Sequence, residues 1–480
     1  MTTDAAGRRG DGVALTVALA VVGVFVTYFP ISAVSISLTA IGQSTGASTS
    51  DLQWVSDAYI VPMAATILSA GVFGDLHGRR RVYLFGIALT ILGATTAAVA
   101  GTLDGRSALH LLWTGQAIAG AGGGIMLPTT LALIAHAVPN LRERARYVGM
   151  WSAGLVGGLA IGPFVSGVIL EHVGWGWIFV PTAVLAVGLF AVAAARLPES
   201  SSPEGRRMDW PGQVTATLAI AVGIYGVIEG GQAGWGAPQT VIGLAVGAVS
   251  LVAFVWVEAR SSSPLMRLDL FRSPEFSASG FAALVALFAL VGAGFLLSIF
   301  LGGTQHLSPL EIATRMVFLN GVTGVASPLV GRLIGRVAPV AVLTSGLAIG
   351  VVAMFLLTAV QADTGFAELA WRLALLGIAQ ALMLSGVSVA AIQSVPHALA
   401  GMAGAANTAL RQTGAALGPA VLGVIFAERV AGGASTTGAL HTGMVVNALL
   451  LLVALAACVA SMRARATARA RVGALSAERV

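Results

Sequence analysis

The stretch that decides the fold runs Gly71-Val-Phe-Gly-Asp-Leu-His-Gly-Arg-Arg-Arg81 and separates two long apolar segments. Its glycines allow a tight turn between two helices, because glycine adopts a positive φ without strain. Asp75 can accept hydrogen bonds from an arginine or from a helix N-terminus. The three arginines are typical of a membrane segment that stays in the cytoplasm. The stretch therefore predicts a cytoplasmic turn between membrane helices. A basic loop without a further role is the alternative, but the spacing recurs later in the chain.

The composition is that of a polytopic membrane protein. Of the 480 residues, 57% are hydrophobic and only 10% are charged, whereas soluble proteins carry about 25% charged residues. The basic residues are all arginine, so a phosphate-binding loop that needs lysine is excluded, and with it direct ATP hydrolysis by the usual route. The net charge of +6 reflects membrane topology, since no basic patch interleaved with aromatic residues indicates nucleic-acid binding.

Fourteen segments are long and apolar enough to cross a bilayer as helices. A span needs roughly 20 apolar residues, and only helical backbone can satisfy its polar groups in lipid within one segment. The predicted spans are 13–39, 53–73, 82–101, 109–137, 145–170, 177–196, 211–229, 238–257, 276–301, 309–331, 338–360, 368–393, 400–427 and 441–462.

The arginines predict the orientation of these spans. Nearly all arginines outside the spans fall on the side of the N-terminus, whereas Arg106 and Arg429 fall on the other side. The positive-inside rule then predicts a bacterial plasma-membrane protein with both termini in the cytoplasm. An even number of spans agrees with this arrangement.

An internal repeat predicts the architecture. The segment 74–79 reappears as 331–336, an offset of 257, and Gly158–Pro163 reappears as Gly414–Pro419, an offset of 256. We predict an all-α fold of two parallel six-helix halves with two inserted helices, which is a transporter plan. The boundaries are 1–200 for the first half, 201–272 for the inserted helices, 273–430 for the first five helices of the second half, and 431–480 for its last helix with an arginine-rich cytoplasmic tail.

With these motifs, nearly the whole chain resembles the major facilitator superfamily, in its fourteen-helix drug:proton antiporter branch. The resemblance implies a multidrug or antibiotic exporter that is not an enzyme and uses no cofactor or metal. It implies that a gate motif holds the cytoplasmic side closed, formed by Gly71, Gly74, Asp75, Gly78, Arg79 and Arg80. It also implies an antiporter motif in the fifth helix, formed by Gly154, Gly158, Gly162, Pro163 and Gly167.

Pro30, Ser35, Gln116 and Gly302 depart from the pattern of that branch, and two of them bear on mechanism. Pro30 aligns with the aspartate that the branch carries in its first helix, and Gln116 aligns with the arginine of its fourth helix. These are the two residues of the family most associated with proton coupling. The departures therefore predict that any coupling to protons uses other groups.

Three ionisable residues are candidates for that coupling, because a charge inside a membrane is costly unless it is paired or hydrated. Asp57 could carry a proton, or it could cap the outer end of the second helix. Arg372, the repeat counterpart of Gln116, could stabilise a carboxylate across the cavity or extend to the outer headgroups. Arg411 shares a helix face with Asn407, and that face either lines a cavity or forms a structural network.

Aromatic and amide side chains are the candidates for a substrate cavity, although aromatic residues in membrane helices often face lipid. The candidates are Phe25, Tyr28, Trp54, Tyr59, Trp113, Gln116, Phe295, Asn407 and Gln412.

The sequence thus predicts a monomeric secondary active exporter of amphipathic small molecules, in contact with membrane lipids and driven by proton exchange. The low number of charges in the spans favours bulky apolar or cationic compounds over sugars or phosphates. A lipid exporter or flippase with weak or no proton coupling is the alternative, because of Pro30 and Gln116. A membrane-embedded enzyme is disfavoured, since no cluster of His, Asp or Glu at a helix end indicates catalysis.

Overall fold

The computed structural model describes residues 2–138, 140–201, 208–334, 336–395 and 399–477. In these segments the chain forms long α-helices and two short 3-10 helices, η1 (Trp175–Phe179) and η2 (Leu268–Arg272). The α-helices are α1 (Thr2–Thr45), α2 (Thr49–His77), α3 (Arg79–Ala100), α4 (Gly105–Ala137), α5 (Leu141–His172), α6 (Val180–Arg196), α7 (Trp210–Ala233), α8 (Pro238–Glu258), α9 (Pro274–Gly303), α10 (Pro309–Ile334), α11 (Pro339–Leu357), α12 (Phe366–Gln393), α13 (Ala400–Ala431) and α14 (Thr436–Ala477).

The prediction of fourteen membrane helices is confirmed. In the described segments, 13 helices are long and apolar enough to cross a bilayer, and the number is fourteen when the two pieces of α2, Thr49–Ile67 and Ser69–His77, which are bent by 55°, count as one span. Several helices are longer than the predicted spans, and α14 continues well past its apolar part. A helix need not end where the hydrocarbon ends, so hydropathy alone does not set helix ends.

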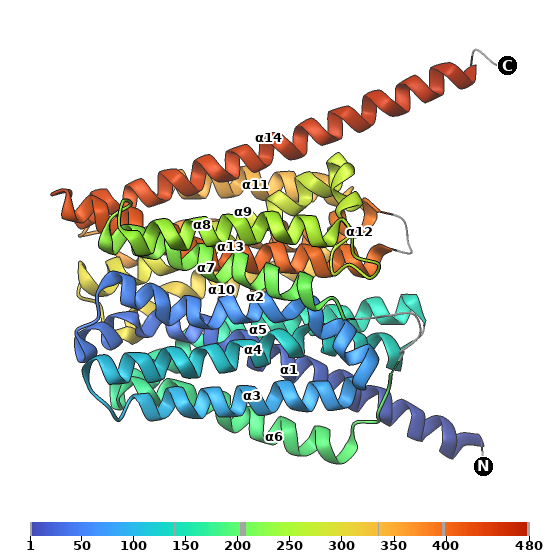
Figure 1. The fold of residues 1–480 in the computed structure, drawn as a ribbon, viewed down its shortest axis with the longest axis horizontal. Helices are drawn as coiled ribbons and strands as arrows, with labels where there is room; N and C mark the ends of the chain where they lie inside the picture. The colour runs from blue at the N-terminus through green and yellow to red at the C-terminus, as the bar shows by residue number, and fades with distance from the viewer. Residues whose placement is uncertain (1, 139, 202–207, 335, 396–398, 478–480) are drawn as a thin grey trace.

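The helices lie side by side along one direction, and the chain enters and leaves the bundle at the same end (Figure 1). We call this the arginine-rich end, because the α2–α3 turn with Arg79–Arg81 also lies there. The other end, with the α1–α2 turn, is called the opposite end. In Figure 1, α1 to α6 lie in the lower part of the view and most of the last six helices lie in the upper part.

Glycines bring α5 against α1, and the repeat brings α13 against α9 in the same way. A Cβ on Gly158 would lie 2.7 Å from the carbonyl oxygen of Phe25, and one on Gly418 would lie 2.5 Å from that of Phe288. Helices approach this closely only where one of them carries no side chain. The repeat in the sequence is therefore matched by equivalent helix packing in the two halves.

The inserted helix α7 lies along α2 and also reaches α13. Near the arginine-rich end, Gln213 of α7 donates to the carbonyl oxygen of Ala65 at 2.6 Å. Further along, the rings of Trp54 and Tyr225 lie 6.3 Å apart. At the opposite end the Trp235 indole, just after α7, donates to the Glu428 carboxylate of α13 at 2.7 Å. Thus α7 covers the seam where α2 of the first half meets α13 of the second.

The segment after α8 returns the chain to the second half. Glu258, at the end of α8, accepts a hydrogen bond from the Met266 backbone at 3.1 Å. Leu265 then packs with Ala409 of α13, and Leu270 joins a buried cluster with residues of α12 and α13. The inserted helices are therefore attached to the first half through α2, and to the second half through both α13 and this segment.

Candidate functional site

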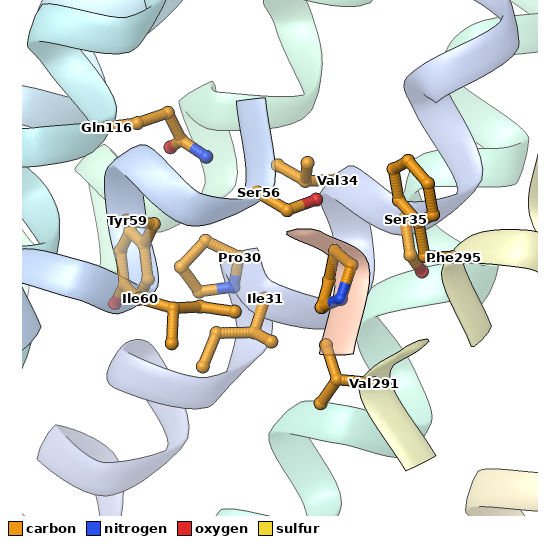
Figure 2. Close-up of a pocket in the computed structure, with 11 residues that line it drawn as sticks. Pro30, Ile31, Val34, Ser35, Ser56, Tyr59, Ile60, Gln116, Val291 and Phe295 are labelled. Atoms are coloured by element: carbon orange, nitrogen blue, oxygen red, sulfur yellow. The ribbon is translucent and has the colours of Figure 1, made fainter. Parts of the chain in front are cut away.

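A small cavity lies where the two halves meet (Figure 2). Its volume is about 20 Å³, which is room for about one water molecule, so the halves lie close together around it in this state. The first half contributes Pro30, Ile31, Val34, Ser35, Ser56, Tyr59, Ile60 and Gln116, and the second half contributes Val291, Phe295 and Pro419. Most of the lining is apolar, and no charged residue is part of it.

Two polar side chains of the cavity are used to hold the helices together. The Tyr59 hydroxyl donates to the Thr27 carbonyl of α1 at 2.7 Å, and the Gln116 amide donates to the Val55 carbonyl of α2 at 3.1 Å. Ser35 and Ser56 are the other polar side chains in the wall. The cavity therefore offers a mostly apolar surface with a few hydroxyl and amide groups.

Three of the predicted cavity residues line this cavity, namely Tyr59, Gln116 and Phe295. The structure places the other aromatic candidates elsewhere. Trp54 packs toward Tyr225 of α7, Phe25 faces Gly157 of α5, and the Trp113 ring lies 5.4 Å from that of His110 in its own helix. Sequence reasoning misplaced them because it could not tell which face of each helix points inward.

The remaining candidates lie closer to the arginine-rich end than the cavity does. Gln412 of α13 reaches across to the sulfur of Met63 in α2 at 3.4 Å. Asn407 is buried. Tyr28 of α1 is buried as well, with its hydroxyl beside the guanidinium of Arg411.

Asp57 is completely buried two turns inside α2. The alternative that Asp57 caps this helix is wrong, because Ser48 and Asp51 form the capping box, with the Ser48 backbone donating to Asp51 at 2.9 Å. In the described part of the chain, neither carboxyl oxygen of Asp57 has a hydrogen-bond partner. A buried charge without a partner is very costly, so this position is unusual for a carboxyl with a purely structural role.

Helical periodicity places Asp57 at the seam under α7 rather than in the cavity wall. Residues three and four apart share a helix face, so Asp57 lies between Trp54, which faces α7, and Gln53, which packs on Gly423 of α13. Gln53 is itself fully buried, and its amide has no hydrogen-bond partner among the described residues. Asp57 and Gln53 are thus two buried polar residues on the face of α2 where α2, α7 and α13 meet.

Arg372 does not meet Asp57. Its guanidinium forms an ion pair with Glu368 of the same helix at 2.7 Å and lies 5.3 Å from the ring centre of Trp371. This pair lies in the first two turns of α12, at the opposite end. Arg372 is therefore compensated locally, and neither alternative of the sequence analysis describes it fully.

Arg411 lies deeper, in α13. Its guanidinium donates to the Ser388 hydroxyl of α12 at 3.4 Å and lies beside Tyr28 of α1. The side chain therefore lies between the two halves.

The gate motif forms a compact turn at the arginine-rich end. Gly78 has a φ of +100°, a conformation that favours glycine, and its amide bonds back to the Gly74 carbonyl at 3.1 Å. Asp75 and Arg79 form an ion pair at 2.7 Å. The Arg80 guanidinium donates to the Ala194 carbonyl of α6 at 2.5 Å. The turn is thereby tied to the end of the sixth helix.

The family model of the Major Facilitator Superfamily matches residues 20–419. The chain belongs to this superfamily. It is 32% identical over 413 residues to the multidrug resistance protein Stp of Mycobacterium tuberculosis. This alignment covers 86% of this chain and 76% of that protein. It is 30% identical to the tetracenomycin C resistance and export protein of Streptomyces glaucescens, over 89% of this chain and 78% of that protein.

The fold agrees with this membership. The structure of a POT family transporter in complex with a thioalcohol-conjugated peptide aligns with a TM-score of 0.69 at 13% identity, over 92% of this chain and 95% of that one. At this identity the likeness shows the fold alone. As a member of the major facilitator superfamily the chain is a multi-pass membrane transporter.

Glu199 is a residue of the gate region that sequence reasoning missed. Its carboxylate accepts from the Arg80 backbone at 3.0 Å at the start of α3, where a negative charge complements the helix dipole. An acid directly after the sixth span, facing an arginine triplet across a loop, was a signal that could have found it. Gln53 and Gln213 were missed because single glutamines between helices carry no distinctive motif.

Asp75→Asn is expected to lower transport while leaving the amount of folded protein near normal. The change removes the charge of Asp75 but keeps an amide oxygen that can still accept from the Arg79 guanidinium, so we expect the turn to stay folded. Transport assays on membranes with matched protein levels measure the effect. Arg81→Gln is the control, since the Arg81 side chain is 81% exposed. Normal transport by Asp75→Asn would show that this turn has no gating role here.

Proposed function

We propose that the chain exports amphipathic small molecules, such as drugs or antibiotics, from the bacterial cytoplasm by proton antiport and alternating access. The observation that carries the proposal is the cavity at the junction of the halves, lined by α1, α2 and α4 of one half and α9 and α13 of the other. A site shared by two halves changes its access when the halves rock. Two relatives, a multidrug resistance protein and a tetracenomycin C resistance and export protein, support drug export.

Contacts between the halves support a state closed at the opposite end. There the Ser298 hydroxyl of α9 donates to the Ser35 carbonyl of α1. A Cβ on Gly302 of α9 would lie 2.3 Å from the Thr39 hydroxyl of α1, and one on Gly167 of α5 would lie 3.0 Å from the backbone of Leu310 in α10. We propose that substrate enters from the arginine-rich end in this state and that these contacts separate when the transporter opens outward.

The lining of the cavity supports an amphipathic substrate. Apolar side chains from Ile31, Val291 and Phe295 can bury a hydrophobic body, and Ser35 and Ser56 offer hydroxyl groups. A binding pocket of this composition gains most of its affinity from the apolar area that it removes from water. A sugar or phosphate, in contrast, needs several directed polar partners.

The test is drug susceptibility combined with transport. The chain is expressed in a bacterial host that lacks its main exporters, and growth is measured against a panel of antibiotics and dyes. Everted membrane vesicles are then tested for energy-dependent uptake of the compounds that become less toxic, with and without a protonophore. Unchanged susceptibility together with no vesicle uptake would contradict the proposal.

The proposed orientation, with the arginine-rich end in the cytoplasm, predicts a labelling pattern. The native Cys458 is buried, so Gly236→Cys and Ser262→Cys can each be studied in a Cys458→Ala background. Gly236 follows α7 at the opposite end, and Ser262 follows α8 at the arginine-rich end. An impermeant maleimide is expected to label only Gly236→Cys in intact cells and both variants in disrupted membranes. The reverse pattern in intact cells would invert the topology.

A further inference from the structure

A line of residues on α13 connects the cavity to Arg411. Pro419 lines the cavity, and residues four apart on a helix lie on one face, so Ala415 and Arg411 follow Pro419 on that face toward the arginine-rich end. On α1, Tyr28 holds the corresponding place one turn from Ile31 of the cavity wall. The Tyr28 hydroxyl and the Arg411 guanidinium meet there. Arg411 therefore lies on the side from which the proposed state admits substrate.

The positive charge of Arg411 is not balanced by a carboxylate in the described part of the chain. Its recorded partners are neutral hydroxyl groups, those of Ser388 and Tyr28, and its Nε atom is buried without a hydrogen-bond partner among the described residues. By contrast, Arg79 pairs with Asp75 and Arg372 pairs with Glu368. Arg315 also has no carboxylate partner among the described residues, but it lies near the opposite end and donates to the Glu311 carbonyl of its own helix. A charge inside a membrane span that has neither a partner nor a function is costly.

Asp57 is too far along the bundle to balance Arg411. Gln53 of α2 packs on Gly423 of α13, and Met63 of α2 meets Gln412 of α13. These two contacts show which residues of α2 and α13 lie at the same height along the bundle. Arg411 lies near the level of residue 64 of α2, seven residues beyond Asp57. At 1.5 Å of rise per residue the two charges are separated by about 10 Å along the helix axes.

We propose that Arg411 binds an acidic group of the exported substrate, so that the transporter favours amphipathic anions, such as aromatic carboxylates, sulfonates or phenolates. The proposal deepens the proposed export function and rests on it. The acidic group lies between Arg411, Tyr28 and Ser388, and the hydrophobic body extends toward the cavity. Asn407, one turn away on the same face, has a buried amide nitrogen without a recorded partner among the described residues and supplies a second donor.

The chemistry of the site distinguishes anions from neutral and cationic compounds. A guanidinium forms strong, often bidentate hydrogen bonds with carboxylates and sulfonates, and it repels a cation. Hydrogen bonds to charged groups account for roughly 10- to 100-fold in binding. The low number of charges in the spans favoured apolar or cationic compounds, because the sequence does not show which of these charges are already paired.

Three dansyl probes with the same fluorescent body test the inference: dansylglycine is an anion, dansylamide is neutral and dansylcadaverine is a cation. Binding to the purified full-length protein is followed by energy transfer from its tryptophans, which reports only probe that is bound to protein. For the wild type we expect dansylglycine to bind at least tenfold more tightly than dansylcadaverine. Arg411→Gln should weaken dansylglycine by about 10- to 100-fold, change dansylamide less than twofold and remove the preference. Arg411→Lys should retain most of it.

Arg315→Gln is the matched control, because Arg315 is a buried arginine of α10 that bonds to its own helix at the Glu311 carbonyl at 3.2 Å. It should leave all three dissociation constants within twofold. Equal weakening of all three probes by Arg411→Gln, or an unchanged preference for dansylglycine, would overturn the inference. If drug export is normal and the anion preference is absent, only the inference fails. If the anion site is present and no compound is exported, only the proposed function fails.

Discussion

Asp57→Asn is expected to abolish substrate-driven proton release while sparing substrate binding. The Asp57 carboxyl is completely buried and has no hydrogen-bond partner among the described residues, and a buried charge without a partner is very costly. Asparagine keeps the size and polarity of the protonated carboxyl but cannot release a proton. If Asp57 is the proton carrier, the two fluxes are linked through its charge, and the variant uncouples them.

The variant should fold at least as well as the wild type, which separates loss of coupling from loss of structure. Removing a buried ionisable group takes away the cost of charging it, so we expect no loss of thermal stability at neutral pH. Asp51→Asn is the matched control in the same helix, since Asp51 belongs to the capping box at the start of α2. It removes one carboxyl from the same helix, six residues before Asp57.

The measurement is proton release in proteoliposomes on addition of substrate, together with substrate binding to the same preparation. Loss of proton release with retained binding, seen only in Asp57→Asn, supports Asp57 as carrier. Transport with an unchanged pH dependence in this variant would exclude that role. It would favour the alternative of lipid export with weak or no proton coupling, which Pro30 and Gln116 already suggest from the sequence.

Gly158→Ala is expected to destabilise the first half strongly, whereas Gly157→Ala should not. A Cβ on Gly158 would lie 2.7 Å from the Phe25 carbonyl oxygen and 3.0 Å from the Phe29 amide of α1, so the two helices must separate. Overpacking of this kind costs about 1–3 kcal/mol. A Cβ on Gly157 meets the Phe25 ring at 3.6 Å, an ordinary contact, and alanine in a helix is favoured over glycine by about 1 kcal/mol.

Thermal unfolding of the two variants in the same detergent gives the comparison. We expect a lower midpoint for Gly158→Ala and an equal or higher one for Gly157→Ala, with export reduced only in the former. Equal midpoints would show that α5 does not depend on this contact. The two variants are well matched, because Gly157 and Gly158 are neighbours in the same helix and the substitution changes hydropathy equally at both.

The fold could be predicted from the sequence because its determinants are local. Apolar length gives each span, arginines give the common end of the termini, and two repeated motifs give the halves. The bend of α2 between Ile67 and Ser69 and the long ends of α1 and α14 could not be predicted in this way. They depend on packing and on the surroundings of each helix rather than on the number of apolar residues.

The candidate site was harder to predict, because helix rotation is set by tertiary packing. Tyr59, Gln116 and Phe295 line the cavity, but Trp54 is only five residues from Tyr59 and faces α7. Asp57 was recognised as unusual from its charge, yet its place beneath an inserted helix could not be deduced. No sequence pattern states that α7 covers the boundary between α2 and α13.

The placement of α7 would link two events in time. α7 bonds to α2 at Gln213 near the arginine-rich end, whereas it meets α13 toward the opposite end, where Gly231 faces Val424 and Trp235 bonds to Glu428. A movement of the two halves that separates α2 from α13 at that end would also separate α7 from α13. Asp57 lies directly below this line of separation. Water would reach the Asp57 carboxyl in the same step that opens the opposite end of the bundle. The inserted helices would therefore determine when in the transport cycle this carboxyl can ionise.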